Sequence, residues 1–497
     1  MDVATVSATS MIGFSSFSLS RYSEDFRLLC RKFPGPRWDG KAFLVPDDLR
    51  AAFVQWLKDH KWRIEEIHHE NPELFKEGVP ESAKPWQRDN AIKGATLGYL
   101  FINDDMGLGK TASAILTCRV RGSRRVLVVT LASVRTTWEE ELDKWWPSAH
   151  VTVYASSKEV QRSQTLLPET VHVVSYELAR ANAEALAGNG YDAIVVDESH
   201  RIKNPDAKQT TAIKYIAEAA KPQLRLALTG TPIAQEPKDL WGQVDFLRPG
   251  SFGKNPWSFY HRYCNVLSHQ WGTKVSGARN VAELQERLEH FCCRVTKRDQ
   301  IVRDSMPGVT SARLDAENKV KVIQEMAETC NESMVVFTFR RKTAHELGDV
   351  LGAPVITGEL PPARRMDKVK TAELLTPSRL VCTMDSMGTG VNLQQFPVAV
   401  VAELSPKLST MRQAVARIHR LSSTRPVTYY FVVYPKGWEP LMVAKLREKL
   451  DAITSIVSEG ASEEILAAFT EPPDVSDKEW AEKLAIELAD YEEDEYL

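Results

Sequence analysis

The chain has 497 residues, of which 43% are hydrophobic and 26% charged, and its formal net charge is −3. These values are typical of a globular protein with two or three domains, and no apolar run approaches the 18 or more residues of a membrane-spanning helix. The seven cysteines include no C-x-x-C pair, which argues against a zinc site and a disulfide framework, and the first twenty residues lack the Lys or Arg of a secretory or transit peptide. We therefore expect a cytoplasmic protein that is neither secreted nor held in a membrane.

The first region, residues 1–78, is expected to form a small α+β module. Turn-forming residues Phe33–Arg37 precede a predicted hairpin, and the hairpin leads into a helix predicted over Asp47–Asp59. Trp38 and Phe43 could stack on an unpaired base, as aromatic platforms do. The alternative, which we favour, is that both belong to the small core of this region.

Two α/β regions follow, residues 79–300 and 301–455, and a helical acidic tail is expected over 456–497, which we interpret as a solvated end. Continuous apolar runs separated by helical stretches predict a parallel sheet buried on both faces in each region, with a ligand cleft between them. An aromatic-rich connector, Pro249–Pro307, is predicted to be helical. The predicted strands are Tyr99–Ile102, Val126–Val129, His172–Val174, Ala193–Val196 and Leu224–Leu228, then Met334–Phe337, Val355–Ile356, Leu380–Cys382, Val398–Val401 and Val427–Val433.

A phosphate-binding loop is predicted at Asp104–Thr111, between a predicted strand and a predicted helix. Gly107 and Gly109 let backbone N–H groups approach an anion at the start of the helix. Lys110 is expected to reach the β- and γ-phosphates of ATP, and the Thr111 hydroxyl to bind Mg²⁺. The strict pattern of such loops begins with Gly where this chain has Asp, so the loop alone is weak evidence.

A pair of carboxylates, Asp197 and Glu198, follows the predicted strand Ala193–Val196. Asp197 is expected to hold Mg²⁺ through water, and Glu198 to orient and deprotonate the attacking water. Acidic pairs also occur as helix caps, but the loop upstream favours the catalytic interpretation. The sequence therefore predicts hydrolysis of ATP with Mg²⁺.

Two further motifs complete the predicted site. Arg417 and Arg420 lie three residues apart, which predicts one helical face that could neutralise charge on the γ-phosphate. Two arginines at this spacing usually mark a solvated face, and only the other motifs favour catalysis. Thr229–Pro232 is predicted to link the state of ATP to lobe movement, with a plain turn as the alternative.

In this order the motifs resemble those of superfamily 2 helicases of the Swi/Snf type, from Pro85 to about Val433. The resemblance rests on Trp86-Gln87-Arg88, Asp104–Thr111, Ser133 with Trp138, Ser175–Glu177, Asp197–Asn204, Leu228–Pro232, Phe337–Lys342, Gly388–Leu393 and Gln413–Arg420. Within the family, Asp104–Met106, Lys203-Asn204 and the connector stretches Arg262–Asn265, Trp271-Gly272 and Asn280–Leu284 are most similar to the HARP-domain annealing-helicase branch, and Phe33–Phe43 is loosely similar to its HARP module.

The chain departs from the family at two places. Thr130-Leu131 stands where the family usually has Cys-Pro, and Leu421-Ser-Ser423 where it usually has Ile-Gly-Gln. Neither change removes a catalytic group. Together with the lack of long insertions, they leave the subfamily open and favour a bacterial or viral member.

The resemblance implies two tandem RecA-like lobes and a DNA-dependent ATPase and helicase that regresses forks, migrates branches or anneals strands in replication, recombination or repair. Its implied partner is double-stranded or branched DNA, with single-stranded-DNA-binding or replication proteins as candidates and a monomer as the expected state. It implies that ATP contacts Gln87, Met106, Gly107, Leu108, Gly109, Lys110, Thr111 and Gly390, and that Thr229, Thr231 and Gln413 couple ATP to movement.

A DNA groove would need hydroxyls, backbone amides and a few basic residues. The candidates, each of which could instead be a surface or capping residue, are Ser133, Arg135, Ser175, Arg201, Lys203, Arg340, Arg341, Ser386 and Gly388. Three alternatives stay open: an RNA helicase, a restriction-type translocase subunit, and a non-catalytic nucleotide-gated DNA clamp. The last is disfavoured because a clamp has no need of the predicted catalytic set, Lys110, Thr111, Asp197, Glu198, Arg417 and Arg420.

Overall fold

The chain divides into two units by its internal contacts. The first is Met1–Asp104 with Gly109–Arg294, and the second is Asp105–Leu108 with Val295–Leu497. Within them the computed structural model describes residues 5–11, 14–19, 37–38, 43–60, 63–65, 73–162, 169–233, 236–269, 272–389, 391–436, 439–444, 446–447 and 450. The predicted tail over 456–497 lies outside these residues. No helix in the described ranges is both long enough and apolar enough to cross a membrane.

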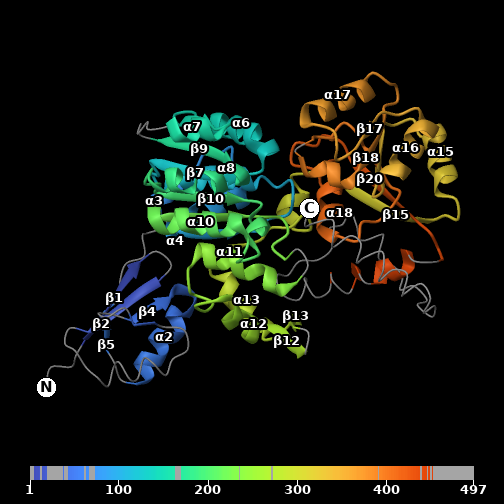
Figure 1. The fold of residues 1–497 in the computed structure, drawn as a ribbon. Coiled ribbons are helices and arrows are strands. Elements are labelled where there is room, and N and C mark those ends of the chain that lie inside the picture. The colour runs from blue at the N-terminus through green and yellow to red at the C-terminus, as the bar shows by residue number, and fades with distance from the viewer. Residues whose placement is uncertain are drawn as a thin grey trace. The chain divides into compact units, whose positions relative to one another are not determined.

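The N-terminal part of the first unit holds a five-stranded sheet of order β3-β4-β2-β1-β5, drawn in blue in Figure 1. The predicted hairpin is present, because Trp38 of β3 is in antiparallel register with Phe43 of β4. The predicted helix over Asp47–Asp59 is confirmed as α2. The elements are β1 (Thr5–Met11), β2 (Phe14–Leu19), β3 (Arg37–Trp38), β4 (Phe43–Pro46), α2, β5 (Arg63–Glu65) and α3 (Glu73–Lys76).

A seven-stranded parallel sheet, of order β14-β6-β11-β10-β7-β9-β8, forms the main body of the first unit. Every strand predicted for this region is present, with ends that differ by at most two residues. All carboxyl ends of a parallel sheet share one edge, so the loops that follow β6, β7, β10 and β11 meet there. The strands are β6 (Tyr99–Ile102), β7 (Arg125–Thr130), β8 (His150–Val153), β9 (Thr170–Ser175), β10 (Ala193–Asp197), β11 (Leu224–Leu228) and β14 (Cys292–Cys293).

Helices flank this sheet (Figure 1), and the connector after it is more than helical. The prediction of a helical connector is wrong in part, because an antiparallel hairpin of β12 (Cys264–His269) and β13 (Gly272–Ala278) lies between its helices. The helices of the unit are α4 (Pro85–Leu97), α5 (Lys110–Val120), η1 (Ala132–Val134), α6 (Arg135–Trp145), α7 (Ser157–Arg162), α8 (Tyr176–Ala181), α9 (Ala183–Ala187), η2 (Ser199–Ile202), α10 (Lys208–Ala220), η3 (Pro237–Asp239), α11 (Leu240–Leu247), α12 (Pro256–Tyr263) and α13 (Val281–Glu289).

The cysteine pair of the connector differs from our interpretation. The connector was predicted to be helical, but its Cys292 and Cys293 belong to β14, which pairs in parallel with β6. Both are free thiols, as are the other described cysteines. A two-residue strand is too short to show an apolar period, so the sequence could not distinguish it from a helical turn.

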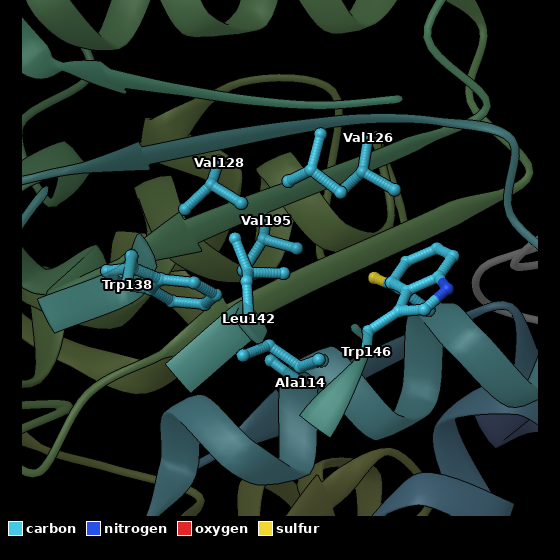
Figure 2. Close-up of a pocket in the computed structure, with 10 residues that line it drawn as sticks. Ala114, Val126, Val128, Trp138, Leu142, Trp146 and Val195 are labelled. Carbon is cyan, nitrogen blue, oxygen red and sulfur yellow. The ribbon is translucent and has the colours of Figure 1, made fainter. Parts of the chain in front are cut away.

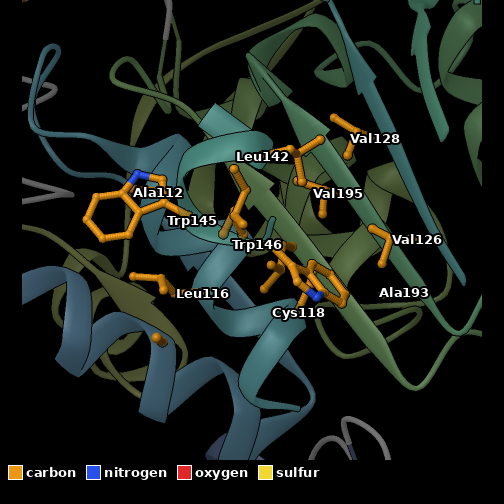
Figure 3. Packing of buried hydrophobic residues seen from close by; sticks show 14 of the residues in the cluster. Ala112, Leu116, Cys118, Val126, Val128, Leu142, Trp145, Trp146, Ala193 and Val195 are labelled. Carbon is orange, nitrogen blue, oxygen red and sulfur yellow. The ribbon is translucent and has the colours of Figure 1, made fainter. Parts of the chain in front are cut away.

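The core of the first unit packs α5 and α6 against β7 and β10. Figure 3 shows Leu116 and Cys118 of α5 and Leu142 of α6 against the valines of the sheet. The side chains leave a gap of about 10 Å³, lined by Trp138, Trp146 and other apolar groups (Figure 2). An apolar gap of this size stays dry. The core is therefore tightly filled beneath the functional edge, and Trp138 reaches from it toward that edge.

The second unit has a six-stranded parallel sheet of order β15-β20-β19-β16-β18-β17. The five strands predicted for this region are confirmed, and β15 was not predicted because its residues are mostly half-exposed. The elements are α14 (Gln300–Arg303), β15 (Val309–Asp315), α15 (Lys319–Thr329), β16 (Met334–Thr338), α16 (Arg341–Leu351), β17 (Val355–Ile356), α17 (Pro362–Glu373), β18 (Arg379–Thr383), η4 (Met384–Thr389), β19 (Val398–Val401), α18 (Leu408–Val415) and β20 (Val427–Val433). The fold is thus α/β, with two parallel sheets flanked by helices.

Candidate active site

The predicted phosphate-binding loop lies between β6 and α5, as a loop of this kind requires. Gly107 and Gly109 have φ values of +86° and +76°, which side chains with a Cβ rarely adopt. α5 begins at Lys110, so its first N–H groups face the loop. Lys110 Nζ donates to the carbonyl oxygen of Asp104 at 2.8 Å, which holds the ammonium at the loop.

The structure explains why Asp replaces Gly at the start of this loop. The Asp104 side chain is fully buried, and its Oδ2 accepts a hydrogen bond from Asn90 Nδ2 of α4 at 2.7 Å. A hydrogen bond to a charged group contributes about 1.5–3 kcal/mol. Asp104 therefore ties the loop to α4, a role that the sequence pattern did not suggest.

The middle of the loop, Asp105–Leu108, groups with the second unit. There the Asp105 carboxylate accepts from the backbone N–H of Lys297 at 3.0 Å and lies 3.8 Å from the guanidinium of Arg412. Leu108 is fully buried, and Met106 is half-buried.

Asp197 ends β10 at the carboxyl edge of the first sheet and is held by three donors. Its Oδ2 accepts from Thr130 Oγ1 at 2.8 Å and from Trp138 Nε1 at 2.9 Å, and its Oδ1 accepts from the backbone N–H of Glu198 at 3.0 Å. Burial, and secondly the charge of Glu198, raise the pKa of Asp197, while the Trp138 and Thr130 hydrogen bonds and nearby Lys110 oppose this rise. The side chain is thus oriented before any ligand binds.

The hydroxyl of Thr130 gives a physical meaning to one departure from the Swi/Snf pattern. Thr130 is the last residue of β7 and is fully buried. A cysteine at this position would donate only weakly. Sequence reasoning noted the substitution and Trp138, but it did not predict that both hold Asp197.

Glu198 has a strained backbone, with φ 49° and ψ 50° in the left-handed region. Non-glycine residues pay about 1–3 kcal/mol for such conformations, which cluster at functional sites. The Tyr176 hydroxyl holds the strained turn by donating to the carbonyl oxygens of Asp197 at 2.5 Å and Glu198 at 3.2 Å. Among the described residues, Glu198 Oε2 is buried and has no hydrogen-bond partner. This oxygen can therefore accept a hydrogen bond from a ligand.

His200 connects the carboxylates to the segment after β11. Its Nδ1 lies 3.1 Å from Thr229 Oγ1 and 3.4 Å from Glu198 Oε2. Burial, and then the charges of Arg201 and Lys203, lower the pKa of His200 to about 4, so the ring is neutral at pH 7. Thr229 Oγ1 accepts the Thr231 N–H at 3.0 Å, and we assign its own proton to His200 Nδ1. The imidazole then carries its proton on Nε2 and donates nothing to Glu198.

Gln87 is also placed at the loop. It is the third residue of α4, and its Nε2 lies 3.5 Å from the carbonyl oxygen of Gly109. The first unit thus brings together eight predicted residues, while Gly390, predicted for ATP, lies outside the described residues. The eight are Gln87, Gly109, Lys110, Thr111, Asp197, Glu198, Thr229 and Thr231.

The predicted DNA contacts of the first unit differ in availability. Ser175 caps α8, because its Oγ accepts from the Leu178 N–H at 3.2 Å. The Arg135 guanidinium donates to the carbonyl oxygens of Tyr154 and Ala132. Arg201 is exposed, Ser133 is half-buried in η1, and Lys203 lies 3.9 Å from Asp239. As placed, Arg201 offers the most accessible charge of this set.

In the second unit, Arg340 is held by the buried carboxylate of Glu403. Its Nε and Nη2 donate to Glu403 Oε1 at 2.9 and 2.6 Å, and Thr343 Oγ1 donates to the same oxygen at 2.8 Å. Glu403 Oε2 accepts the N–H groups of Phe339 and Arg340 at 3.0 and 2.8 Å. A DNA contact by this guanidinium would have to compete with Glu403.

Of the other DNA contacts predicted in the second unit, Arg341 and Ser386 already have partners within the unit. Arg341 forms an exposed ion pair with Glu359. Ser386 is fully buried, and its hydroxyl donates to the carbonyl oxygen of Thr383 at 2.6 Å. Gly388 lies in η4.

The predicted helical face of Arg417 and Arg420 is wrong. α18 contains Gln413 but ends at Val415; Arg417 lies in the turn that follows, and Arg420 lies in the irregular segment after this turn. Burial, and secondly the charge of Arg417, lower the pKa of Arg420 to about 9. The Arg420 guanidinium remains charged at pH 7, and its Nε donates to the Ala416 carbonyl oxygen at 3.2 Å.

Comparison with known protein families identifies the family of this chain. Residues 69–315 match the model of the SNF2-related domain, and residues 318–422 match that of the helicase conserved C-terminal domain. Together the two matches cover about 70% of the chain. The chain belongs to the SNF2-related family. The two matched domains are ATPase domains, so this SNF2-related protein is an ATP hydrolase.

Individual relatives are more distant. A SWI/SNF-related matrix-associated actin-dependent regulator of chromatin subfamily A-like protein 1 from Xenopus tropicalis is 25% identical over 460 residues, which are 81% of this chain and 48% of the relative. The human DNA annealing helicase and endonuclease ZRANB3 is 31% identical over 233 residues, 44% of this chain and 21% of the relative. The chain spans about half the length of the first of these relatives.

Solved structures of Sulfolobus solfataricus are also similar to this SNF2-related chain. The SWI2/SNF2 ATPase core in complex with dsDNA is 18% identical, covers 82% of this chain and 97% of its own, and has a TM-score of 0.41. The same ATPase core domain alone is 19% identical with a TM-score of 0.42. The family assignment rests on the two domain matches, not on these scores.

The donor set fits a magnesium ion with ATP. Mg²⁺ prefers oxygen ligands and keeps several waters, so one carboxylate and one hydroxyl suffice beside the phosphates. Asp197 supplies an oriented carboxylate whose charge a cation would stabilise, and Thr111 supplies a hydroxyl in the first turn of α5. In the described part of the chain, no group of three or more His, Cys, Asp or Glu side chains is placed to hold a metal ion.

Proposed function

We propose that the chain is an ATP-dependent translocase that moves along double-stranded or branched DNA. The observation that carries the proposal is the edge of the first sheet, where Lys110, Asp197 and Glu198 gather. Family membership supports the interpretation of this edge as the ATPase site. The names of the relatives, an annealing helicase and a core bound to dsDNA, support DNA as the track.

In the proposed reaction, each residue acts by position and charge. Lys110 would leave the Asp104 carbonyl and neutralise the phosphates, and Thr111 and Asp197 would hold Mg²⁺. The ion supplies charge stabilisation for phosphoryl transfer when bound. Glu198 orients and deprotonates the attacking water through Oε2, which has no hydrogen-bond partner among the described residues. Arg417 and Arg420 are proposed to neutralise charge on the γ-phosphate.

The coupling of hydrolysis to DNA is proposed to run through His200 and Thr229. The bond between them joins the segment that carries Glu198 to the Thr229–Pro232 segment. A neutral imidazole suits this link, because it keeps its hydrogen bond at any pH well above 4.

Fork regression, branch migration or strand annealing is proposed as the biological task. Its support is the similarity to annealing helicases and the small N-terminal sheet before the motor, in the place of a HARP-like module. An RNA helicase or a restriction-type translocase remains the second candidate.

One experiment tests both the proposed nucleic acid, DNA, and the proposed action on forks. ATP hydrolysis would be measured for the purified chain with no nucleic acid, linear duplex, single-stranded DNA, forked DNA and RNA. We expect strong stimulation by duplex or fork and little by RNA, because DNA binding should favour the catalytically complete conformation. Stimulation by RNA alone would contradict the choice of DNA, and no hydrolysis under any condition would favour the clamp.

A further inference from the structure

α11 lies against the backbone of η2, the segment that follows the catalytic pair. A Cβ on Gly242 would lie 2.0 Å from the carbonyl oxygen of Ile202 and 3.0 Å from that of Lys203. Both contacts are with backbone, which cannot turn aside as a side chain can. Glycine is therefore required at this position, and η2 and α11 are packed so closely that neither can shift alone.

The next residue, Gln243, is fully buried and makes three hydrogen bonds (the element α11 is labelled in Figure 1). Its Oε1 accepts from Ser199 Oγ at 2.8 Å. Its Nε2 donates to the carbonyl oxygens of Pro232 at 2.7 Å and Asp239 at 2.9 Å. Both protons of the amide and its oxygen are therefore used.

These bonds join two segments of the site. Ser199 directly follows Glu198, and Pro232 ends the Thr229–Pro232 segment. Removal of this buried amide would leave the carbonyl oxygens of Pro232 and Asp239 without the hydrogen bonds that it donates. Among ordinary side chains, only a glutamine or asparagine offers one acceptor and two donors in this arrangement, and asparagine is one methylene shorter.

We propose that Gln243 is a positioning residue for ATP hydrolysis. It holds the backbone that carries Glu198 at a fixed distance from the Thr229–Pro232 segment. It does so in parallel with the His200–Thr229 bond, so the two segments are joined at two points. The proposal rests on the proposed role of Glu198 as the base.

The test compares three variants by steady-state ATP hydrolysis and by binding of a fluorescent ATP analogue. Gln243→Met keeps nearly the same volume and removes the amide, and Ser199→Ala removes only the bond to the segment of Glu198. We expect Gln243→Met to lower kcat about tenfold, with KM and the number of analogue molecules bound per chain unchanged. Ser199→Ala should lower kcat less, and the double variant should be no worse than Gln243→Met alone.

Asn182 offers a matched control in the same unit. It is a buried amide whose Nδ2 donates to a hydroxyl, Ser157 Oγ, and to a backbone carbonyl, that of Leu178, both at 2.9 Å. It lies after α8, apart from the carboxylates. Asn182→Leu should lower the free energy of unfolding about as much as Gln243→Met does, but it should leave kcat per bound nucleotide unchanged.

The outcomes separate this proposal from the one on which it rests. A kcat within twofold of wild type for Gln243→Met, additive losses in the double variant, or a loss matched by fewer bound analogue molecules would overturn the positioning role. Should Gln243→Met fail to fold, an unchanged kcat for Ser199→Ala overturns it equally. A Glu198→Gln variant that hydrolyses ATP normally would refute the base itself, whatever Gln243 does.

Discussion

The carboxyl edges of the two parallel sheets differ in what their charged residues do. At the edge of the first sheet, Glu198 has a strained backbone, and its Oε2 has no hydrogen-bond partner within the described ranges. At the edge of the second sheet, Glu403 accepts from two backbone N–H groups, Arg340 and Thr343, and the buried Lys319 is paired with Glu439 at 2.6 Å. The first edge leaves polar atoms for a ligand, whereas the second satisfies its charges internally.

This difference shows that charge at a strand's end does not by itself indicate chemistry. Both edges carry acidic and basic residues directly after buried strands, which is the sequence pattern by which a site at a sheet edge is recognised. Only the partners of each atom distinguish a carboxylate that stabilises the fold from one that can act on a substrate. The following variants test this distinction.

The largest effect is expected for Lys110→Ala. Removal of the ammonium that is proposed to neutralise the phosphates should lower kcat at least about a hundredfold, since one lost preorganised donor costs about 10²–10³ in kcat. DNA binding should be largely intact. Turnover and a gel-shift assay on duplex DNA measure the two, and normal turnover would refute the ATPase site.

Glu403→Ala and Glu198→Ala should separate the two edges most directly. Loss of Glu403 strips partners from two backbone N–H groups and from Arg340, so we expect the free energy of unfolding to fall by about 2–3 kcal/mol. Loss of Glu198 should remove turnover and leave stability unchanged or higher. Chemical denaturation with an ATPase assay measures both. Equal stability losses in the two variants would contradict the comparison.

A smaller effect is expected for Thr130→Val, which removes the hydroxyl that holds Asp197 without changing the size of the side chain. We expect kcat to fall about tenfold, as when a metal ligand, the role proposed for Asp197, loses a supporting hydrogen bond. Thr210 of α10 provides the matched control, because its buried hydroxyl has no partner among the described residues. Thr210→Val should leave kcat unchanged, and a similar loss in both variants would contradict the role of Thr130.

The smallest effect concerns stability and pH. Burial lowers the pKa of His172 to about 4, below the ordinary 6.5. Between these values the unfolded chain binds a proton that the folded chain does not, so stability is greatest above pH 6.5 and is lost as the pH falls toward 4. His172→Phe should reduce this slope, which denaturation at several pH values measures. Part of the slope should remain in this variant, because burial lowers the pKa of His200 to about 4 as well.

Tyr191→Phe serves as the control for His172. It removes the same hydrogen bond, between the Tyr191 hydroxyl and His172 Nδ1 at 2.7 Å, but retains the imidazole. The slope should then persist with a lower stability at every pH. A slope that disappears in Tyr191→Phe as well would assign the effect to the hydrogen bond instead of the proton.

The fold could be predicted from the sequence where its strands are continuous apolar runs separated by helical segments. Val126–Val129 and Met334–Phe337 are continuous apolar runs, and both are central strands. The hairpin Cys264–Ala278 was missed because its strands mix polar and apolar residues and follow an aromatic stretch that favoured a helix. β14 was missed because two residues carry no period, and only its partner β6 makes it a strand.

The candidate site could be predicted where a motif lies within one segment. The positive φ of Gly107 and Gly109 and the position of Asp197 at a strand's end follow from local pattern. Partners that come from distant segments could not be predicted, as with Asn90 for Asp104 or Gln243 for Ser199. The end of α18 before Arg417 was also not signalled, since neither Pro nor Gly follows it.

Given the proposed role of Glu198 as the catalytic base, its strained backbone opposes stability to activity at a single position. A residue held at φ 49° would be relaxed by glycine, or partly by asparagine, either of which adopts this conformation at lower cost. A search for heat-resistant variants would therefore be expected to select such replacements here and, in doing so, to collect inactive enzyme. Any programme that stabilises this protein should hold position 198 fixed.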